Sequence, residues 1–250
     1  MISREIYMKR IRPFINTELI KVFTGIRRSG KSVMLELVKN ELKKYGVSDK
    51  NFLCINFEQF SNSELLDAKI LHKRIVEFQK SADGKIYLFF DEIQEVDGWE
   101  KCINSYRVDF DCDIYITGSN AKLLSGELAT YLAGRYVEFV IYPFSFAEFL
   151  EMNRQKNSQI DKSACFMTFL KTGGMPFLAN FLGDDSAKNQ YLMDIYNSVV
   201  LKDVVKRNNI RDVDTLERII AYAFSNIGHI FSATSLSKYF KSEKRNISHD

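Results

Sequence analysis

The sequence predicts an α/β protein in which a parallel sheet carries helices on both faces. Between about residues 19 and 142, short apolar runs alternate with helix-like segments. The runs are rich in Ile, Val, Phe and Tyr, as buried strands are, and strands that alternate with helices favour parallel pairing. After Pro143 the pattern becomes helical, which indicates a second, smaller part of the chain.

Five apolar runs account for the predicted strands: LIKVFTG (19–25), NFLCINF (51–57), KIYLFFDE (85–92), DIYITGS (113–119) and YVEFVIY (136–142). Between the first two lies the segment 31–46, which has the period of an amphipathic helix. Its predicted buried face holds four residues, Leu35, Val38, Leu42 and Tyr45. Gly46 is a plausible end for this helix, since glycine favours the left-handed C-terminal cap.

The region after Pro143 shows helix start and stop signals. Ser145 and Glu148 have the spacing of a capping box, and Gly173-Gly174 ends the next predicted helix. Two amphipathic segments follow at 187–206 and 214–226, the second with Asp214 and Glu217 as start signals and Gly228 as a stop. We therefore predict an α/β domain over 1–145, a helical, lid-like domain over 146–228, and the beginning of a further region over 229–250.

Composition and charge exclude several classes. Hydrophobic residues make up 46% of the 250 residues and charged residues 27%, which excludes a largely disordered chain. The net charge of +3 permits a nucleic-acid partner without arguing for one. No apolar run approaches the roughly 18 residues that span a bilayer, and the four cysteines show no zinc-like spacing. We expect buried free thiols and a cytoplasmic protein that contacts no membrane.

The strongest motif is GIRRSGKS at 25–32, which fits the phosphate-loop (Walker A) pattern G-x-x-x-x-G-K-[ST]. A chance match is expected roughly once in a hundred chains of this length. Here the motif follows a predicted strand and opens a predicted helix, which is the context that phosphate binding requires. The motif predicts a nucleotide site, with ATP as ligand, at Gly25, Arg28, Ser29, Gly30, Lys31, Ser32 and Val33.

Each of these residue types has a physical reason. Glycines let backbone N–H groups approach a polyphosphate closely and adopt unusual dihedral angles. Lys31 supplies a positive charge for the β- and γ-phosphates, and Ser32 supplies a hydroxyl for Mg²⁺.

A second motif places two acids at the end of a buried strand. Five apolar residues at 86–90 precede Asp91 and Glu92. Ligands of open α/β sheets bind at the carboxyl ends of the strands, where the phosphate loop would also lie. We expect Asp91 to hold Mg²⁺, directly or through water, and Glu92 to act as general base toward the attacking water.

Two weaker signals follow. The strand at 113–119 ends in small polar residues, so Ser119 or Asn120 would hydrogen-bond the γ-phosphate or the water, with a capped turn as the alternative. Arg135 would neutralise the charge that develops in phosphoryl transfer, in its own chain or in a neighbouring one. Tyr7 and Ile11 are weak candidates for contacts to adenine.

Together, GIRRSGKS, FFDEIQEVDGWE, TGSNAKLLS, LAGRY and YPFSFAEFL resemble a family of prokaryotic AAA-type P-loop ATPases, as do GGMPFLANF and VVLKDVVKRNNI. Members join a nucleotide domain to a winged helix and a C-terminal domain of unknown function. The resemblance implies a strand between those that carry Lys31 and Asp91, a place expected for NFLCINF. It also implies Asn120 or Ser119 as a sensor and Arg135 as an arginine finger, and these two roles depend on assembly.

The last segment, HIFSATSLSKYFKSEKRNISHD (229–250), resembles the start of a winged helix. Leu236 and Phe240 would face the core, and four basic residues would face outward: Lys238, Lys241, Lys244 and Arg245. The sequence stops at Asp250, before a recognition helix and wing would be complete, so we do not expect this segment to read base edges.

These observations predict Mg²⁺-dependent ATP binding and hydrolysis, coupled to a conformational change that acts on a partner. The alternative is a nucleotide-gated protein- or DNA-binding module with little turnover, which would use the same residues. A small-molecule kinase is disfavoured because Glu92 suits the activation of water. The partners implied are ATP or ADP, a second copy of the chain, and a protein or DNA contacted through the C-terminal region.

Overall fold

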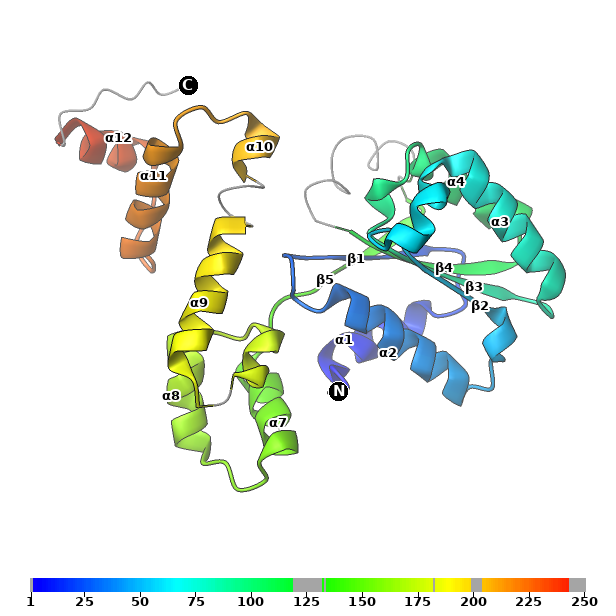
Figure 1. Cartoon of the computed structure of the whole chain (residues 1–250), viewed down its shortest axis with the longest axis horizontal. Coiled ribbons are helices and arrows are strands. Elements are labelled where there is room, and N and C mark those ends of the chain that lie inside the picture. The colour runs from blue at the N-terminus through cyan, green and yellow to red at the C-terminus, as the bar shows by residue number, and fades with distance from the viewer. Residues whose placement is uncertain (1, 119–131, 133, 182, 199–203, 243–250) are drawn as a thin grey trace. The chain divides into compact units, whose positions relative to one another are not determined.

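A five-stranded parallel sheet forms the centre of the first part of the chain (Figure 1). The computed structural model describes residues 2–118, 132, 134–181, 183–198 and 204–242. The predicted fold class is confirmed, and each predicted strand is present. The strands are β1 (Ile20–Thr24), β2 (Phe52–Asn56), β3 (Ile86–Asp91), β4 (Cys112–Thr117) and β5 (Tyr136–Val140).

Helices cover both faces of this sheet. In Figure 1, α1 (Glu5–Ile11) and α2 (Lys31–Lys44) lie on one face, and α3 (Ala68–Ser81) and α4 (Trp99–Asp109) lie on the other. Side chains alternate along the strands between the two faces, as the pleat requires. Strands β1 and β3 are buried on both faces, and β3 accordingly reads as a nearly continuous apolar run in the sequence.

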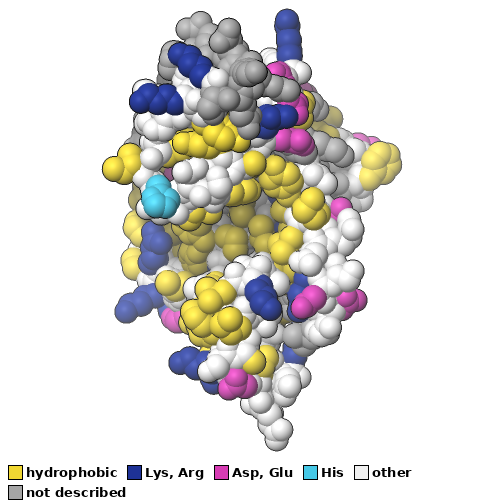
Figure 2. Space-filling model, turned by 90° about the vertical axis from the view of Figure 1, so that its left-hand side faces the viewer, with side chains coloured by type: hydrophobic (Ala, Val, Ile, Leu, Met, Phe, Trp, Pro, Cys, Tyr) yellow, Lys and Arg dark blue, Asp and Glu magenta, His cyan; other side chains and the backbone are white. Residues whose placement is uncertain are grey.

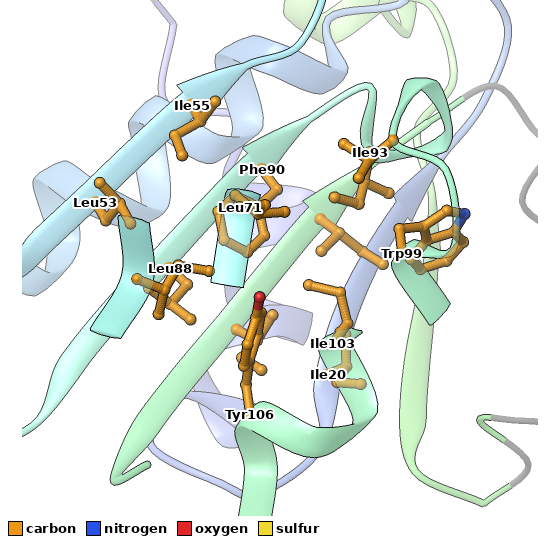
Figure 3. Close-up of a cluster of buried hydrophobic side chains, with 14 of the residues drawn as sticks. Ile20, Leu53, Ile55, Leu71, Leu88, Phe90, Ile93, Trp99, Ile103 and Tyr106 are labelled. Carbon is orange, nitrogen blue, oxygen red and sulfur yellow. The ribbon is translucent and has the colours of Figure 1, made fainter. Parts of the chain in front are cut away.

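The larger core cluster lies between the sheet and the helices α3 and α4. Figure 3 shows Leu88 and Phe90 of β3 among side chains of these helices, which include Leu71 and Ile103. Tyr106 of α4 has no exposed surface and also packs there. The opposite face of the sheet packs against α1 and α2 in a second cluster that is rich in aromatic rings.

The spatial order of the strands is β2-β3-β4-β1-β5. The expectation that NFLCINF lies between the strands that carry Lys31 and Asp91 is therefore wrong. Strand β4 occupies that place, and β2 lies at the edge of the sheet. The connection through α2 carries the chain past the width of two strands, and the later strands β3 and β4 fill the space between β1 and β2.

Two further helices, α7 (Phe146–Lys156) and α8 (Lys162–Thr172), follow the sheet. The Ser145–Glu148 capping box begins α7, and α8 ends at Gly173, as predicted. Phe149 and Leu150 of α7 and Cys165 of α8 form a third apolar cluster, which Ile2 joins from the N-terminal segment.

The chain divides into two compact units, residues 1–188 and 189–250. The domain boundaries predicted at 145/146 and 228/229 stay predictions. Among the described residues, the later α-helices are α9 (Asp185–Ile195), α10 (Val204–Asn208), α11 (Val213–Ser225) and α12 (Ala233–Ser242). In the second unit, Tyr222 of α11 packs against Tyr239 of α12 with ring centroids 4.8 Å apart, and Phe240 is buried. Lys244 and Arg245 lie outside the described residues.

Several local predictions need correction. Tyr45 is 60% exposed rather than buried, because α2 ends at Lys44 and Tyr45 follows it beyond the edge of the core. Helix α11 begins one residue before the predicted segment: Asp212 caps it by accepting a hydrogen bond from the Thr215 N–H, and Asp214 lies in its first turn. All four cysteines are free thiols, but Cys54 is exposed. Within the described part of the chain, no helix combines the length and hydrophobicity needed to cross a membrane.

A buried ion pair links two neighbouring strands. Lys21 of β1 and Asp113 of β4 both have fully buried side chains, and the Lys21 ammonium donates to Asp113 and to the Thr17 carbonyl. Burial lowers the pKa of Lys21, and the Asp113 carboxylate opposes that shift. Tyr115 completes the network by donating to Asp113 over 2.7 Å.

We predict that Asp113→Ala lowers the free energy of unfolding by about 3–5 kcal/mol, because it leaves the Lys21 ammonium buried and unpaired. Urea denaturation followed by the fluorescence of Trp99 measures this change. The matched control is Asp111→Ala, since the exposed Asp111 forms an ion pair with the partly exposed Lys85 at 3.6 Å. The control should behave like the wild type, and equal losses in the two variants would contradict the assignment.

Candidate nucleotide-binding site

The loop between β1 and α2 follows a path that only glycine can take at its first position. Gly25 has φ +139°, and a Cβ there would lie 2.2 Å from the carbonyl oxygen of Ile141. Gly30, which caps α2, has φ +101°, and Arg28 also adopts a left-handed conformation with φ 64°. Several residues of positive φ before a helix N-terminus are typical of loops whose N–H groups surround an anion.

Lys31 begins α2 and is almost fully buried, with 5% of its surface exposed. Its Nζ lies 3.3 Å from the Gly25 carbonyl oxygen and 3.4 Å from that of Ile26. The same ammonium lies 3.7 Å from Glu92 Oε1. The structure therefore brings the lysine of the phosphate-loop pattern to the second acid of the predicted pair.

The other loop residues differ in their exposure. Ser29 is buried, and its Oγ has no hydrogen-bond partner among the described residues. Ser32 is exposed in the first turn of α2, and Val33 is half-buried. A buried hydroxyl without a partner is costly, so an orphaned Oγ beside a glycine-lined loop fits a site that a polar ligand would complete.

Asp91 ends β3 with both carboxylate oxygens held by hydrogen bonds. Thr117 Oγ1 at the end of β4 donates to Oδ1, and Asn56 Nδ2 at the end of β2 donates to Oδ2 over 3.0 Å. Asp91 is 6% exposed, so these partners fix a buried carboxylate at the carboxyl edge of the sheet.

Glu92 follows in a left-handed conformation, with φ 55°. Its N–H donates to Thr117 Oγ1 over 3.0 Å, and Gln94 Nε2 donates to its Oε2 over 2.6 Å. The carboxylate thus lies between Lys31 and Gln94. Sequence reasoning missed Asn56, Thr117 and Gln94, although the first two are polar residues that end apolar strands, as Asp91 does.

A further acid, Glu58, lies near this pair. Partial burial raises the pKa of the Glu58 carboxyl, and the negative charge of Glu92 acts in the same direction. Arg27 of the loop opposes the shift. The end of the sheet thus combines a buried ammonium and a glycine-lined loop with several carboxylates, a donor set that suits a polyphosphate together with a divalent cation.

Not every predicted residue joins this site. Ser119 and Asn120 lie outside the described residues. Arg135 comes just before β5, which runs parallel to β1. It therefore lies at the amino-terminal ends of the strands, whereas the loop lies at their carboxyl ends. There Arg135 donates a hydrogen bond to Asn104 over 2.9 Å. Tyr7 and Ile11 lie on the buried face of α1, and Ile11 has no exposed surface to offer a ligand.

The fold and the loop define the class of protein as a P-loop nucleotide-binding domain. Residues 17–150, just over half of the chain, match the family model of the AAA domain, and the chain belongs to this family. Residues 165–249 match a second family model, a domain of unknown function (DUF8612). The resemblance to prokaryotic AAA-type P-loop ATPases that carry such a C-terminal domain is confirmed.

Two curated relatives are similar over nearly the whole chain, and both are uncharacterized. One, from Haemophilus influenzae, is 41% identical over 244 residues, which are 98% of this chain and 60% of the relative. The other, MJ1544 of Methanocaldococcus jannaschii, is 32% identical over 255 residues, covering 97% of this chain and 54% of the relative. The chain therefore spans little more than half the length of these relatives.

Among solved structures, the chain is similar to RuvB of Thermotoga maritima, a Holliday junction branch migration motor, with 17% identity and a TM-score of 0.50. The match covers 95% of this chain and 82% of that one. A variant of the same protein gives 17% identity and a TM-score of 0.51 with equal coverage. At this level of identity, the likeness supports the fold and not a shared activity.

We predict that Gly25→Ala lowers the free energy of unfolding by more than about 2 kcal/mol, because the new Cβ meets the Ile141 carbonyl at a φ that alanine disfavours. Gly84→Ala is the control: Gly84 also has a positive φ, of +78°, but a Cβ there meets nothing within 4 Å. The control should cost about 1 kcal/mol. Equal costs in urea denaturation would show that the approach to Ile141 does not constrain the loop.

Proposed function

We propose that the chain binds ATP with Mg²⁺ and hydrolyses it, and that the nucleotide state controls an interaction with a partner. The observation that carries the proposal is the approach of Lys31 Nζ to Glu92 Oε1 at 3.7 Å, beside a loop built on Gly25 and Gly30. The ammonium of Lys31 and the carboxylate of Glu92 lie together at the carboxyl ends of the strands, where ligands of this fold class bind, and this supports a role for Lys31 in phosphate binding and for Glu92 as general base.

In the proposed reaction, the loop N–H groups and Lys31 hold the β- and γ-phosphates. When ATP binds, the Lys31 ammonium pairs with phosphate oxygens in place of the Gly25 and Ile26 carbonyl oxygens and Glu92. The Glu92 carboxylate is then free to act as a base. Glu92 then accepts a proton from water as the water oxygen bonds to the γ-phosphorus. The bond from the γ-phosphorus to the bridging oxygen breaks, and ADP and phosphate leave.

Ser32 and Asp91 are the residues proposed to hold Mg²⁺. Asp91 is already oriented by Thr117 and Asn56, and Ser32 is exposed on the first turn of α2. When bound, the ion would neutralise charge on the phosphate oxygens.

Arg135 is proposed to act on a neighbouring copy of the chain. It lies at the amino-terminal ends of the strands, a strand length away from the loop, so it does not face the phosphate site of its own chain. An arginine supplied by a neighbour would stabilise transition-state charge only in an assembly.

The placement of Arg135 far from the loop of its own chain favours a second candidate function, a nucleotide-gated binding module with little turnover in the isolated chain. Here the ion pair with Lys31 and the hydrogen bond from Gln94 keep Glu92 occupied. Retention of one equivalent of intact ATP through gel filtration would support the module, and conversion to ADP would oppose it.

For the partner, the second unit favours a protein over DNA. Large hydrophobic side chains are exposed at the end of α11 and just beyond it: Phe224, Ile227, Ile230 and Phe231. On the face in Figure 2, the Lys and Arg side chains of the described residues are scattered among acidic and apolar ones. Salt-sensitive binding of a labelled DNA duplex would contradict this preference.

The decisive variants are Lys31→Ala and Glu92→Gln. We expect Lys31→Ala to weaken ATP binding by on the order of a hundredfold, because the buried cation is lost. Glu92→Gln should bind ATP as well as the wild type but lower kcat by about a hundredfold or more, because it cannot accept the proton. Calorimetric titration and phosphate release measure the two effects.

The control is Glu95→Gln, three residues along and exposed, which should leave turnover unchanged. Wild-type turnover in Glu92→Gln would refute the assigned base. Wild-type turnover that rises more steeply than linearly with protein concentration, and that Arg135→Ala abolishes, would support an arginine acting between chains. Turnover linear in concentration would oppose that assignment.

A further inference from the structure

Arg4 is a buried arginine in the N-terminal segment, far from the phosphate loop in sequence. Only 2% of its surface is exposed. Its guanidinium donates to the Ser29 carbonyl over 2.9 Å, to the Tyr142 carbonyl over 2.8 Å, and to Glu148 Oε1 over 2.9 Å. One side chain therefore connects the loop, the segment that leaves β5, and helix α7.

The surroundings of Arg4 hold it in one position. Burial of a guanidinium is costly, and it persists only where an ion pair and further hydrogen bonds compensate. The rings of Tyr7 and Phe144 pack on it, with the guanidinium carbon 4.6 and 5.1 Å from their centroids. The backbone of Arg4 also adopts a left-handed conformation, with φ 47°, which a non-glycine residue keeps only where its contacts require it.

The contact with Ser29 fixes one peptide unit of the loop. A trans peptide is planar, so its C=O and the following N–H point in opposite directions. Because Arg4 holds the Ser29 carbonyl, the N–H of Gly30 is turned away from Arg4. The approach is close: a Cβ on Gly30 would lie 3.3 Å from Arg4 Nη1.

The contact with Glu148 connects the loop to the first turn of α7. Glu148 is the acid of the capping box, and its Oε2 accepts from the Ser145 N–H over 2.9 Å. Burial alone would raise the pKa of Glu148, but hydrogen bonds from Arg4 and Ser145 lower it below its ordinary value. The carboxylate is thus held in the charged form opposite Arg4.

We propose that Arg4 is a positioning residue for nucleotide binding: it fixes the Ser29–Gly30 peptide of the phosphate loop and ties it to α7 through Glu148. It does so without touching the nucleotide. The inference rests on the proposed function, since it names a residue that prepares the same loop for a phosphate. It also gives α7 a route by which its position affects nucleotide affinity.

The first test compares Arg4→Gln, Arg4→Lys and Glu148→Gln with the wild type by calorimetric titration with ADP, at a temperature where each variant is folded. Arg4→Gln should raise Kd roughly tenfold or more, because a charge-assisted bond to the loop is lost. The Kd of Arg4→Lys should lie between those of Arg4→Gln and the wild type, since an ammonium cannot donate to all three partners with the geometry of a guanidinium. Glu148→Gln keeps the bond to Ser29 and should cost less than Arg4→Gln.

The matched control is Arg12→Gln. Arg4 precedes helix α1 and Arg12 follows it. Arg12 also forms ion pairs, with Glu5 and Glu41, but these are partly exposed and do not contact the loop. It should leave Kd unchanged. A lower Tm in Arg4→Gln with a Kd equal to that of Arg12→Gln would overturn the proposal, because Arg4 would then serve stability alone.

A second readout needs no nucleotide. Hydrogen–deuterium exchange of the loop peptide 25–30 should be faster in Arg4→Lys than in wild type and Arg12→Gln, while peptides of β3 exchange equally. Unchanged loop exchange would overturn the proposal even if Arg4→Gln failed to fold. A wild type that bound no ADP would refute the proposed function, whereas this exchange comparison would still decide whether Arg4 holds the loop.

Discussion

The candidate site depends on one constraint, the path of the backbone between β1 and α2. At Gly25 the chain passes so close to the Ile141 carbonyl that no Cβ fits. This approach sets the direction in which the loop leaves the sheet. The loop then curves around the Lys31 ammonium, which lies 3.3 Å from the Gly25 carbonyl oxygen. The carbonyl of Ile141 belongs to the segment after β5, so the same contact ties the loop to the strand that pairs with β1.

The second requirement is the parallel sheet, because it brings unrelated strand ends to one edge. Asn56, Asp91 and Thr117 come from the ends of three adjacent strands and form one hydrogen-bonded group. Their mutual contacts orient Asp91 before any ligand binds. The buried Arg4–Glu148 ion pair also holds the loop, because Arg4 donates to the Ser29 carbonyl. The loop thus lies between this ion pair and the polar network at the strand ends. Preorganised groups of this kind lose little entropy when a charged ligand arrives.

Much of this arrangement was predictable from the sequence, for physical reasons. The loop motif and the acidic pair are local patterns, and the five apolar runs reflect strands of a largely buried sheet. The order of the strands was not predictable, since nothing local in NFLCINF distinguishes an edge strand from a central one. The role of Arg4 was also hidden, because its partners lie 25 and 144 residues away and only the fold brings them together. Asn56 and Thr117 end apolar runs as Asp91 does, and that signal could have found them.

The most direct test of the central claim is a single-turnover measurement, with the protein in excess over radiolabelled ATP and with Mg²⁺ present. The account predicts that ATP binds the chain and that the bound ATP is converted to ADP and free phosphate in one exponential phase. Failure of ATP to bind would contradict the assignment of the loop. ATP that binds but stays intact, at every protein concentration, would contradict the assignment of Glu92 as the base and leave a nucleotide-gated module.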